Sequence, residues 1–250
     1  MIKFFRKIRY DLMEKNKTGK YLKYAIGEII LVVIGILIAL SINNWNEKRK
    51  SDNAETYLLT SLNKEFRLNK TLLENNLIRI DSTISHLSIL LKLMNKTVEN
   101  NYTDHSLDSI IYYSLANYSW EPSDFTLKEI ENSSNLSNLK NKELGLLLYD
   151  WASFYQEIEK RESLSATGFN HYLSIIKQYG SLRQLDRFGR RLPEGGSILR
   201  PNNRHLLKNP EFENAVNDYM IFTRSLQERY KRAVLKLDVI IKMTDKYITS

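Results

Sequence analysis

An almost uninterrupted apolar run between residues 24 and 45 constrains the fold of this chain more than any other feature of its sequence. Residues 29–40 are all apolar, and Glu28 and Ser41 are the only polar residues between positions 25 and 42. A helix of this length rises about 27 Å at roughly 1.5 Å per residue, which is close to the hydrocarbon thickness of a bilayer. We therefore predict a helix that can span a membrane.

Three interpretations of this run compete. A buried core helix would need an apolar partner surface on every side, and no later segment is comparably apolar. A cleaved signal peptide would fit the apolar core and the small residues of Ala39-Leu40-Ser41. However, the segment before the run is about twice the usual length of a signal peptide's first region, and Trp45 lies where an interfacial aromatic anchor is expected. We favour an uncleaved signal anchor at residues 25–45.

The charge distribution predicts the orientation of this anchor. Residues 1–24 carry eight basic and two acidic side chains, whereas residues 45–250 carry 29 basic and 26 acidic ones. An excess of Lys and Arg before a span favours a cytoplasmic N-terminus. We therefore predict a basic cytoplasmic tail at 1–24 and a domain outside the cytoplasm at 46–250. Most of the net charge of +8 belongs to the tail, so its expected partner is an anionic lipid bilayer and not nucleic acid.

Beyond the span, two long segments have apolar residues at the alternating steps of three and four that are typical of a helical bundle or coiled-coil seam. In the first segment the positions are Leu59, Phe66, Leu73, Leu77, Ile80, Ile84, Leu87, Leu91, Met94 and Val98. The second begins at Pro210, a favourable first residue of a helix, and continues almost to Ser250.

Shorter helices are expected between these segments. We predict one at about 104–117, a short piece that ends near Glu131, and a long helix at about 141–179 in which Thr167-Gly168 is a candidate break. Trp151, Phe154 and Tyr155 have the spacing of core residues in that long helix. No run alternates at period two over the length of a strand. The predicted fold is therefore all-α, with one N-terminal transmembrane helix followed by an extracytoplasmic bundle of long antiparallel helices.

Residues 183–210 are expected to be irregular, because they contain several residues that interrupt helices. These are Gly189, Pro193, Gly195, Gly196, Pro201 and Pro210. They also form a basic cluster, whose members are Arg183, Arg187, Arg190, Arg191, Arg200, Arg204 and Lys208. One interpretation is a loop that binds an anion, such as a lipid headgroup, a polysaccharide or an acidic partner protein. The alternative, which we favour, is a solvated connection whose arginines pair with surface acids.

Residues with catalytic or metal-binding spacing are not found. The four histidines are isolated, and none has a second ligand three or four positions away. The sequence has no glycine-rich phosphate loop, no nucleophile elbow and no cysteine. We therefore predict no catalytic residues, no metal site and no cofactor.

Two features of the apolar run bear on assembly. Glu28 is a costly residue inside an apolar helix, and it either reaches headgroups or a lysine at the membrane boundary or has a role in function or assembly. Gly35 and Ala39 form a small-x3-small pair, and Gly27 lies on nearly the same face. Such faces let helices approach closely, so we predict a homo-oligomer.

Three parts of the sequence resemble an uncharacterised domain-of-unknown-function family of single-pass membrane proteins common in Bacteroidota. They are MIKFFRKIRYDLM with KYLKYAIGEIILVVIGILIALSINNWNE, the middle segment FTLKEIENSSNLSNLKNKELGLLLYDWASFY, and NPEFENAVNDY near the C-terminus. The family's middle motif has a glycine after two serines, where this chain has Asn135 after Ser133-Ser134. The resemblance implies an inner-membrane anchor with a periplasmic helical domain, and it implies no established activity.

Three functions fit these observations. The first is a non-catalytic, oligomeric scaffold that binds other proteins of the cell envelope. The second is a periplasmic ligand sensor that works through a partner membrane protein, with a pocket at the loop 183–208 or at the turn around Trp120. The third, an enzyme acting on envelope polymers, has the least support, and we predict that the protein is not an enzyme.

Overall fold

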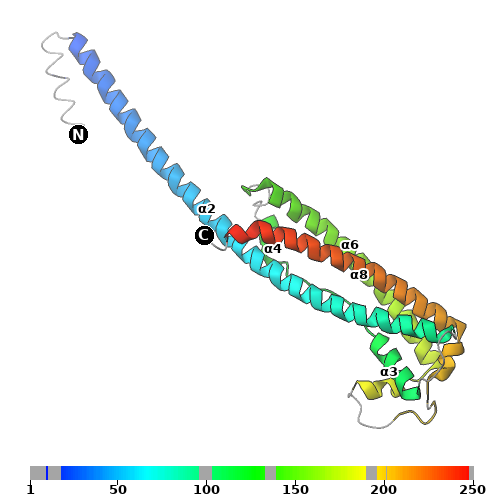
Figure 1. Ribbon diagram of the computed structural model, residues 1–250. Coiled ribbons are helices and arrows are strands. Elements are labelled where there is room, and N and C mark those ends of the chain that lie inside the picture. The colour runs from blue at the N-terminus through cyan, green and yellow to red at the C-terminus, as the bar shows by residue number, and fades with distance from the viewer. Residues whose placement is uncertain are drawn as a thin grey trace. The chain divides into compact units, whose positions relative to one another are not determined.

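A computed structural model describes residues 10, 18–95, 103–132, 139–189, 196–200 and 202–247. Every regular element in these ranges is a helix, which confirms the all-α prediction (Figure 1). The chain divides into two compact units, Met1–Tyr57 and Leu58–Ser250, which are described separately below. The Ser133-Ser134-Asn135 motif and most of the basic tail lie outside the described residues.

The first unit contains the N-terminal part of helix α2 (Thr18–Met94). This part holds the apolar run, and it is the one helix among the described residues that is long and apolar enough to cross a membrane. None of its most apolar eighteen-residue window is buried by other parts of the chain. The core-helix interpretation is therefore wrong, and the run remains a candidate membrane span.

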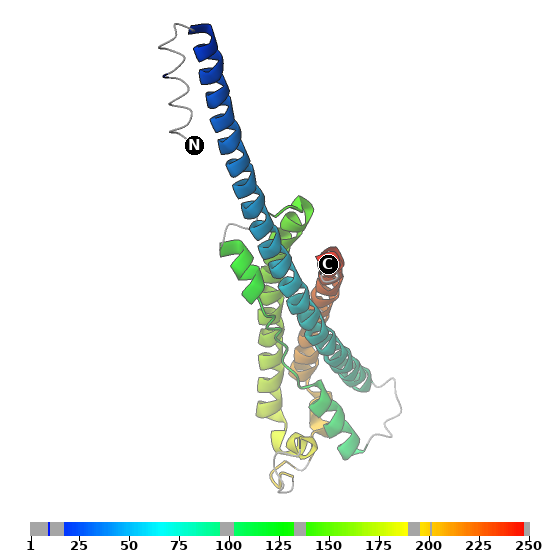
Figure 2. The ribbon, with the colours of Figure 1, turned by 90° about the vertical axis from the view of Figure 1, so that its left-hand side faces the viewer.

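The second unit, hereafter the helical unit, is built from three long helices: α2 from Leu58 onward, α6 (Lys142–Tyr179) and α8 (Pro210–Thr244). Helix α8 packs antiparallel to both of the others, and cross-helix ion pairs show the register. Nζ of Lys70 on α2 lies 2.6 Å from Oδ1 of Asp238 on α8. Oε2 of Glu157 on α6 lies 3.0 Å from Nη1 of Arg229 on α8. Figures 1 and 2 show these helices running side by side.

Local capping residues define where the helices begin and end, largely as the sequence predicts. The side chain of Asn141 accepts a hydrogen bond from the backbone N–H of Leu144 at the start of α6, and Gly180 follows its last residue. Asn209 caps α8 in the same way, ahead of Pro210. Helix α8 ends at Thr244 and is followed by a short 3-10 helix η3 (Asp245–Tyr247).

The shorter elements differ from the predictions in their bounds. Helix α3 (Asp104–Ser114) ends earlier than predicted, and α4 (Phe125–Asn132) matches the expected short piece. The region predicted to be irregular contains three short helices, α7 (Leu182–Leu185), η1 (Asp186–Phe188) and η2 (Arg204–Lys208). Helices α7 and η1 contact α3, and η2 contacts α8, and the local sequence does not reveal these contacts.

Helix α6 continues without interruption through Gly168, so the candidate break at this position is wrong. A Cβ atom at Gly168 would lie 2.8 Å from Cδ2 of Phe222 and 3.2 Å from Cα of Tyr219, both on α8. The glycine therefore allows two helix backbones to approach closely. Its role is in packing and not in ending the helix.

The apolar seams predicted from the sequence form the core of the helical unit. Leu59, Phe66, Leu73, Ile80 and Leu87 of α2 are at most 1% exposed. Trp151 and Phe154 are also buried, and Tyr155 packs against the same core cluster, as their spacing predicts.

Candidate functional site

The predicted residues of the apolar run all lie on the first part of α2. They are Gly27, Glu28, Gly35, Ala39 and Trp45. No neighbouring atom lies within 4 Å of a Cβ placed on Gly27 or Gly35, so a second helix can approach closely at both positions. Trp45 is 62% exposed, and the guanidinium of Arg49 lies 5.0 Å from the centroid of its ring. This pairing of an aromatic ring with a cation is typical of a membrane–water boundary.

The basic cluster divides into arginines with structural partners and side chains that face solvent. Nη1 of Arg200 donates to the backbone carbonyls of Gln178 and Gly180, at 2.8 and 2.9 Å, at the C-terminus of α6. Arg204 forms an ion pair with Asp104 at the start of α3. Arg200 therefore satisfies carbonyl groups that the helix end leaves without partners, and Arg204 pairs with a surface acid.

The other members of the cluster show no common arrangement. Arg183, Arg187 and Lys208 are exposed, and Arg187 donates to the side-chain oxygen of Gln184 at 3.2 Å. Arg190 and Arg191 lie outside the described residues. The described arginines of the cluster are thus not brought together into one anion site.

A buried polar network that the sequence analysis missed anchors this region. Oδ1 of Asn203 accepts from the backbone N–H of Ser181 at 2.7 Å, and its Nδ2 donates to Oδ1 of Asp108 at 2.7 Å. Asp108 is 2% exposed, and this burial raises the pKa of its carboxyl, against the opposing effect of the Asn203 hydrogen bond. The network joins α3, the end of α6 and the loop that precedes η2.

An extended segment at residues 115–124, hereafter the strap, connects α3 to α4 and runs along the helical unit (Figure 2). An extended segment cannot satisfy its own backbone polar groups, so other elements must do so. Asn69 of α2 donates to the carbonyl of Ser123 at 2.7 Å and accepts from its N–H at 2.8 Å. Asn76 donates to the carbonyl of Ser119, and Thr83 shares a 2.7 Å hydrogen bond with the hydroxyl of Tyr118.

Trp120 is the buried centre of the strap, with an exposed fraction of 2%. Its indole N–H donates to the carbonyl of Asn69 at 3.2 Å, and its ring meets those of Trp151, Tyr155 and Tyr230 edge-on. These rings pack around the indole and place it in the core of the helical unit.

One carboxylate, Glu162 of α6, holds the strap backbone at the same place. Its Oε1 accepts from the N–H of Trp120 at 2.8 Å and from the hydroxyl of Tyr230 at 2.5 Å. Burial raises the pKa of the Glu162 carboxyl, while these two hydrogen bonds oppose the shift. Burial and nearby carboxylates also raise the pKa of the Tyr155 hydroxyl to about 12, so this group stays protonated and can donate to the Trp120 carbonyl.

A cleft of about 670 Å³ opens beside the strap, between α2 and α6. Its apolar lining includes Leu115, Ala116, Phe169, Leu173 and Leu182. This volume is in the range of small-molecule pockets, and its lining combines apolar side chains with a few polar ones, as such pockets do.

Two charged side chains also line this cleft, Arg79 of α2 and Asp186 of η1. The guanidinium of Arg79 lies 5.5 Å from the centroid of the Tyr118 ring. The cleft therefore has an apolar lining with a cation and a carboxylate on different elements.

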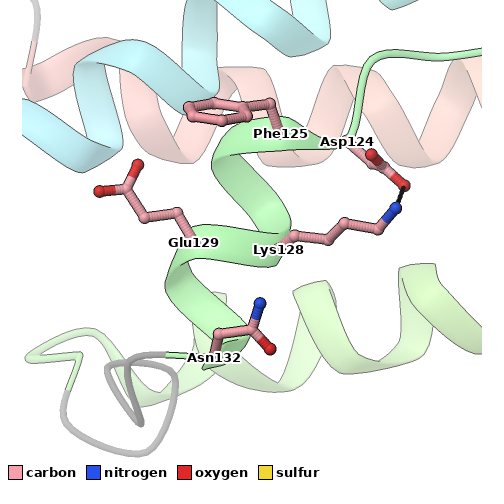
Figure 3. Close-up of a pocket in the computed structure, with 5 residues that line it drawn as sticks. All are labelled: Asp124, Phe125, Lys128, Glu129 and Asn132. Carbon is pink, nitrogen blue, oxygen red and sulfur yellow. Dashed lines mark ion pairs between the residues drawn. The ribbon is translucent and has the colours of Figure 1, made fainter.

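A second hollow lies over α4 (Figure 3). Asp124 and Lys128 form an ion pair at 2.7 Å on one side of this helix, and Glu129 lies on the other side, while Phe125 is 75% exposed. All the lining residues come from α4 and the residue before it. The absence of converging groups from another described element makes it a weaker candidate than the cleft beside the strap.

Residues 28–111 match the model of one family. This part of the chain is similar to a family of unknown function (DUF6090). The match covers part of the apolar run, the rest of α2 and most of α3. It confirms the resemblance to an uncharacterised family over these residues. Neither the curated proteins nor the solved structures contain a match to the chain.

The cleft takes part of its lining from the two places where the sequence suggested a pocket, with Asp186 and Gly189 in the loop 183–208 and Tyr118 close to Trp120. A further local signal in the sequence points to the strap beside it. Asn69, Asn76 and Thr83 recur at steps of seven next to the apolar seam of the same helix. A regular polar stripe beside a buried seam indicates that something polar packs there. Here it is the backbone and side chains of the strap.

Proposed function

We propose that the protein is a single-pass protein of the bacterial inner membrane, with its N-terminus in the cytoplasm and residues 46–250 in the periplasm. There it acts as a non-catalytic, oligomeric scaffold for other envelope proteins. The observation that carries the proposal is the apolar run of α2, whose most apolar window has no buried residue. Each exposed Å² of apolar surface costs about 25 cal/mol in water, and a bilayer would remove this cost.

The surface of the helical unit supports an interaction role. Leu146 and Tyr149 of α6 and Leu235 of α8 are 65–71% exposed, although most side chains of their size in this unit are packed inside. Lys236 of α8 pairs with Asp150 of α6, so the exposed apolar residues flank a seam between two packed helices. Exposed apolar groups near such a seam offer a surface for a partner protein.

The topology can be tested with single cysteines, because the natural chain has none. Cells that produce Ser51→Cys or Lys7→Cys are treated with a membrane-impermeant maleimide after the outer membrane is permeabilised. The proposal expects labelling of Ser51→Cys in these permeabilised cells and of Lys7→Cys only after the inner membrane is also lysed. The reverse pattern would overturn the proposed orientation.

Assembly through the membrane span has a separate test. Replacing both Gly35 and Ala39 with Leu should weaken oligomers that persist in mild detergent, because larger side chains separate the helices. Val33→Leu, on the opposite face of the helix, is the matched control. Unchanged oligomers in the double variant would rule out this interface.

The scaffold role is tested by crosslinking intact cells, purifying the full-length protein and identifying attached proteins by mass spectrometry. Specific envelope proteins that are lost when Leu146 and Leu235 are replaced by Ser would support the proposal. A species without attached proteins would contradict it.

A ligand sensor is a second candidate function. The observation that favours it is the cleft beside the strap, whose lining includes Asp186 and Gly189 of the loop 183–208 and Tyr118 near the turn at Trp120. In this role the protein would signal through a partner membrane protein.

A further inference from the structure

The cleft beside the strap lies where only one extended segment covers the space between two helices. Between the end of α3 and Trp120, the space between α2 and α6 is covered by an extended segment with the small residue Ala116. Leu115 and Ala116 line the cleft from the strap, and Phe169 and Leu173 line it from α6. All four are partly exposed, so this apolar surface is accessible to a small molecule.

The charged side chains of the cleft restrict what can bind there. Among the described residues, Arg79 has no carboxylate partner; its polar contact is with Oδ1 of Asn76 at 3.4 Å. Stacking over the Tyr118 ring holds the guanidinium while leaving N–H groups available, and its planar fork suits a carboxylate. Ser82, one turn further along α2, also lines the cleft and carries a hydroxyl donor.

Asp186 lines the cleft from η1 and disfavours a second negative charge on the ligand. Dicarboxylates and phosphate esters therefore fit less well than a single carboxylate. The apolar lining requires that the rest of the ligand be a hydrocarbon body of moderate size.

We propose that this cleft binds a small amphipathic monocarboxylate, with its carboxylate on Arg79 and its apolar body against Leu115, Phe169 and Leu173. The ligand could be an aliphatic or an aromatic acid, since both have the same chemistry at Arg79. The proposal goes beyond the scaffold function and holds whether or not the helical unit recruits partner proteins.

The test uses the full-length protein in lipid nanodiscs and a photoreactive diazirine analogue of octanoate. After irradiation, mass spectrometry maps the labelled peptides. We expect label within residues 112–118 and 169–186, and displacement by excess octanoate or 4-phenylbutyrate but not by octanol, which lacks the charge. Stronger competition by octanoate identifies an aliphatic acid, and stronger competition by 4-phenylbutyrate identifies an aromatic one.

Two variants and a control test the assigned contacts. Arg79→Gln should raise the octanoate concentration needed for displacement about tenfold, because a charge-assisted hydrogen bond is lost. Ala116→Leu should abolish site-specific label by filling the cleft. Arg224→Gln, a neutralised exposed arginine on α8, should change neither result. Three outcomes would each overturn the proposal: label outside the two segments, equal competition by octanol, or no effect of Arg79→Gln. The result for Arg79→Gln does not depend on whether Ala116→Leu folds.

Discussion

The hydroxyl of Tyr230 on α8 donates to Oε1 of Glu162 on α6 at 2.5 Å. The same oxygen accepts the backbone N–H of Trp120, so one carboxylate joins two long helices to the strap. Desolvation disfavours the charged form of Glu162, and the two donors favour it. The balance is a raised pKa of the Glu162 carboxyl.

We predict that Glu162→Gln changes the pH dependence of stability. Because the folded-state pKa of Glu162 lies above its ordinary value of 4.5, the stability that this group contributes is fully present below about pH 4.5. It is lost as pH rises through the folded-state pKa. A neutral glutamine retains an oxygen acceptor, so the variant should gain stability relative to the wild type between pH 4 and pH 8. Thermal unfolding followed by circular dichroism across this range measures the difference.

Asp245→Asn provides a control of opposite sign. Hydrogen bonds from Arg67 and Asn63 hold the pKa of the Asp245 carboxyl below its ordinary value of 3.8. Its contribution to stability is therefore present above about pH 3.8 and is lost as pH falls through the folded-state pKa. The variant should be less stable than the wild type at pH 7 and approach it in acid. The same trend in both variants would contradict the assignments.

Trp120→Ala should destabilise the helical unit by about 3–5 kcal/mol, as is typical when a large buried aromatic residue is removed. The loss combines a cavity among Trp151, Tyr155 and Tyr230 with the missing hydrogen bond to Asn69. The measurement is the shift of the thermal unfolding midpoint.

Two further tryptophan variants test whether the loss is specific to the indole of Trp120. Trp120→Phe keeps an aromatic ring and should lose less stability than Trp120→Ala. Trp45→Ala removes a ring that is 62% exposed and should leave the unfolding of the helical unit unchanged. Equal losses at positions 120 and 45 would show that Trp120 does not hold the strap.

Arg200→Gln should loosen the end of α6, because two backbone carbonyls lose their donor. The expected cost is about 1 kcal/mol, since the side chain is exposed. Amide hydrogen exchange should accelerate in residues 176–182. Arg183→Gln, from the same basic cluster, should leave this exchange unchanged, and an equal acceleration in both variants would argue for a general charge effect.

The parts of the fold that depend on local spacing could be predicted from the sequence. Steps of three and four place Leu59, Phe66 and Leu73 on one face of a helix whatever lies opposite, and that face is buried. Pro210 marks a helix start because its backbone preference is local. Gly180 follows α6 as predicted, but its backbone is extended, and a Cβ there would lie 2.8 Å from Oδ1 of Asn203, so its cause is a tertiary contact.

The candidate site depends on contacts between distant residues, and this is why the sequence alone indicates a pocket only at the loop 183–208 or at the turn around Trp120 and does not give its full lining. The path of the strap is set by Asn69 and Glu162, which lie 51 and 42 residues from Trp120. The basic charge of the loop was evident, but Arg204 pairs with Asp104, 100 positions away. The sequence shows which residues are charged, but it does not show which distant residues they pair with.

Gly168 shows how a local signal can have a non-local cause, and it gives the last prediction. Alanine is favoured over glycine in an isolated helix by about 1 kcal/mol. In α6, however, the added Cβ would lie 2.8 Å from Phe222 and 3.2 Å from the backbone of Tyr219. Overpacking of this kind costs about 1–3 kcal/mol, so Gly168→Ala should lower the unfolding midpoint of the helical unit.

Gly19→Ala is the control for this change, because no atom lies within 4 Å of the added Cβ and no described helix packs against this position, so the unfolding midpoint of the helical unit should not fall. Adding Phe222→Ala to Gly168→Ala should not restore full stability, since the contact with the Tyr219 backbone remains and the ring is lost. If Gly168→Ala instead matched or exceeded the wild-type midpoint, α6 and α8 would not approach closely at this point. The glycine would then have no packing role.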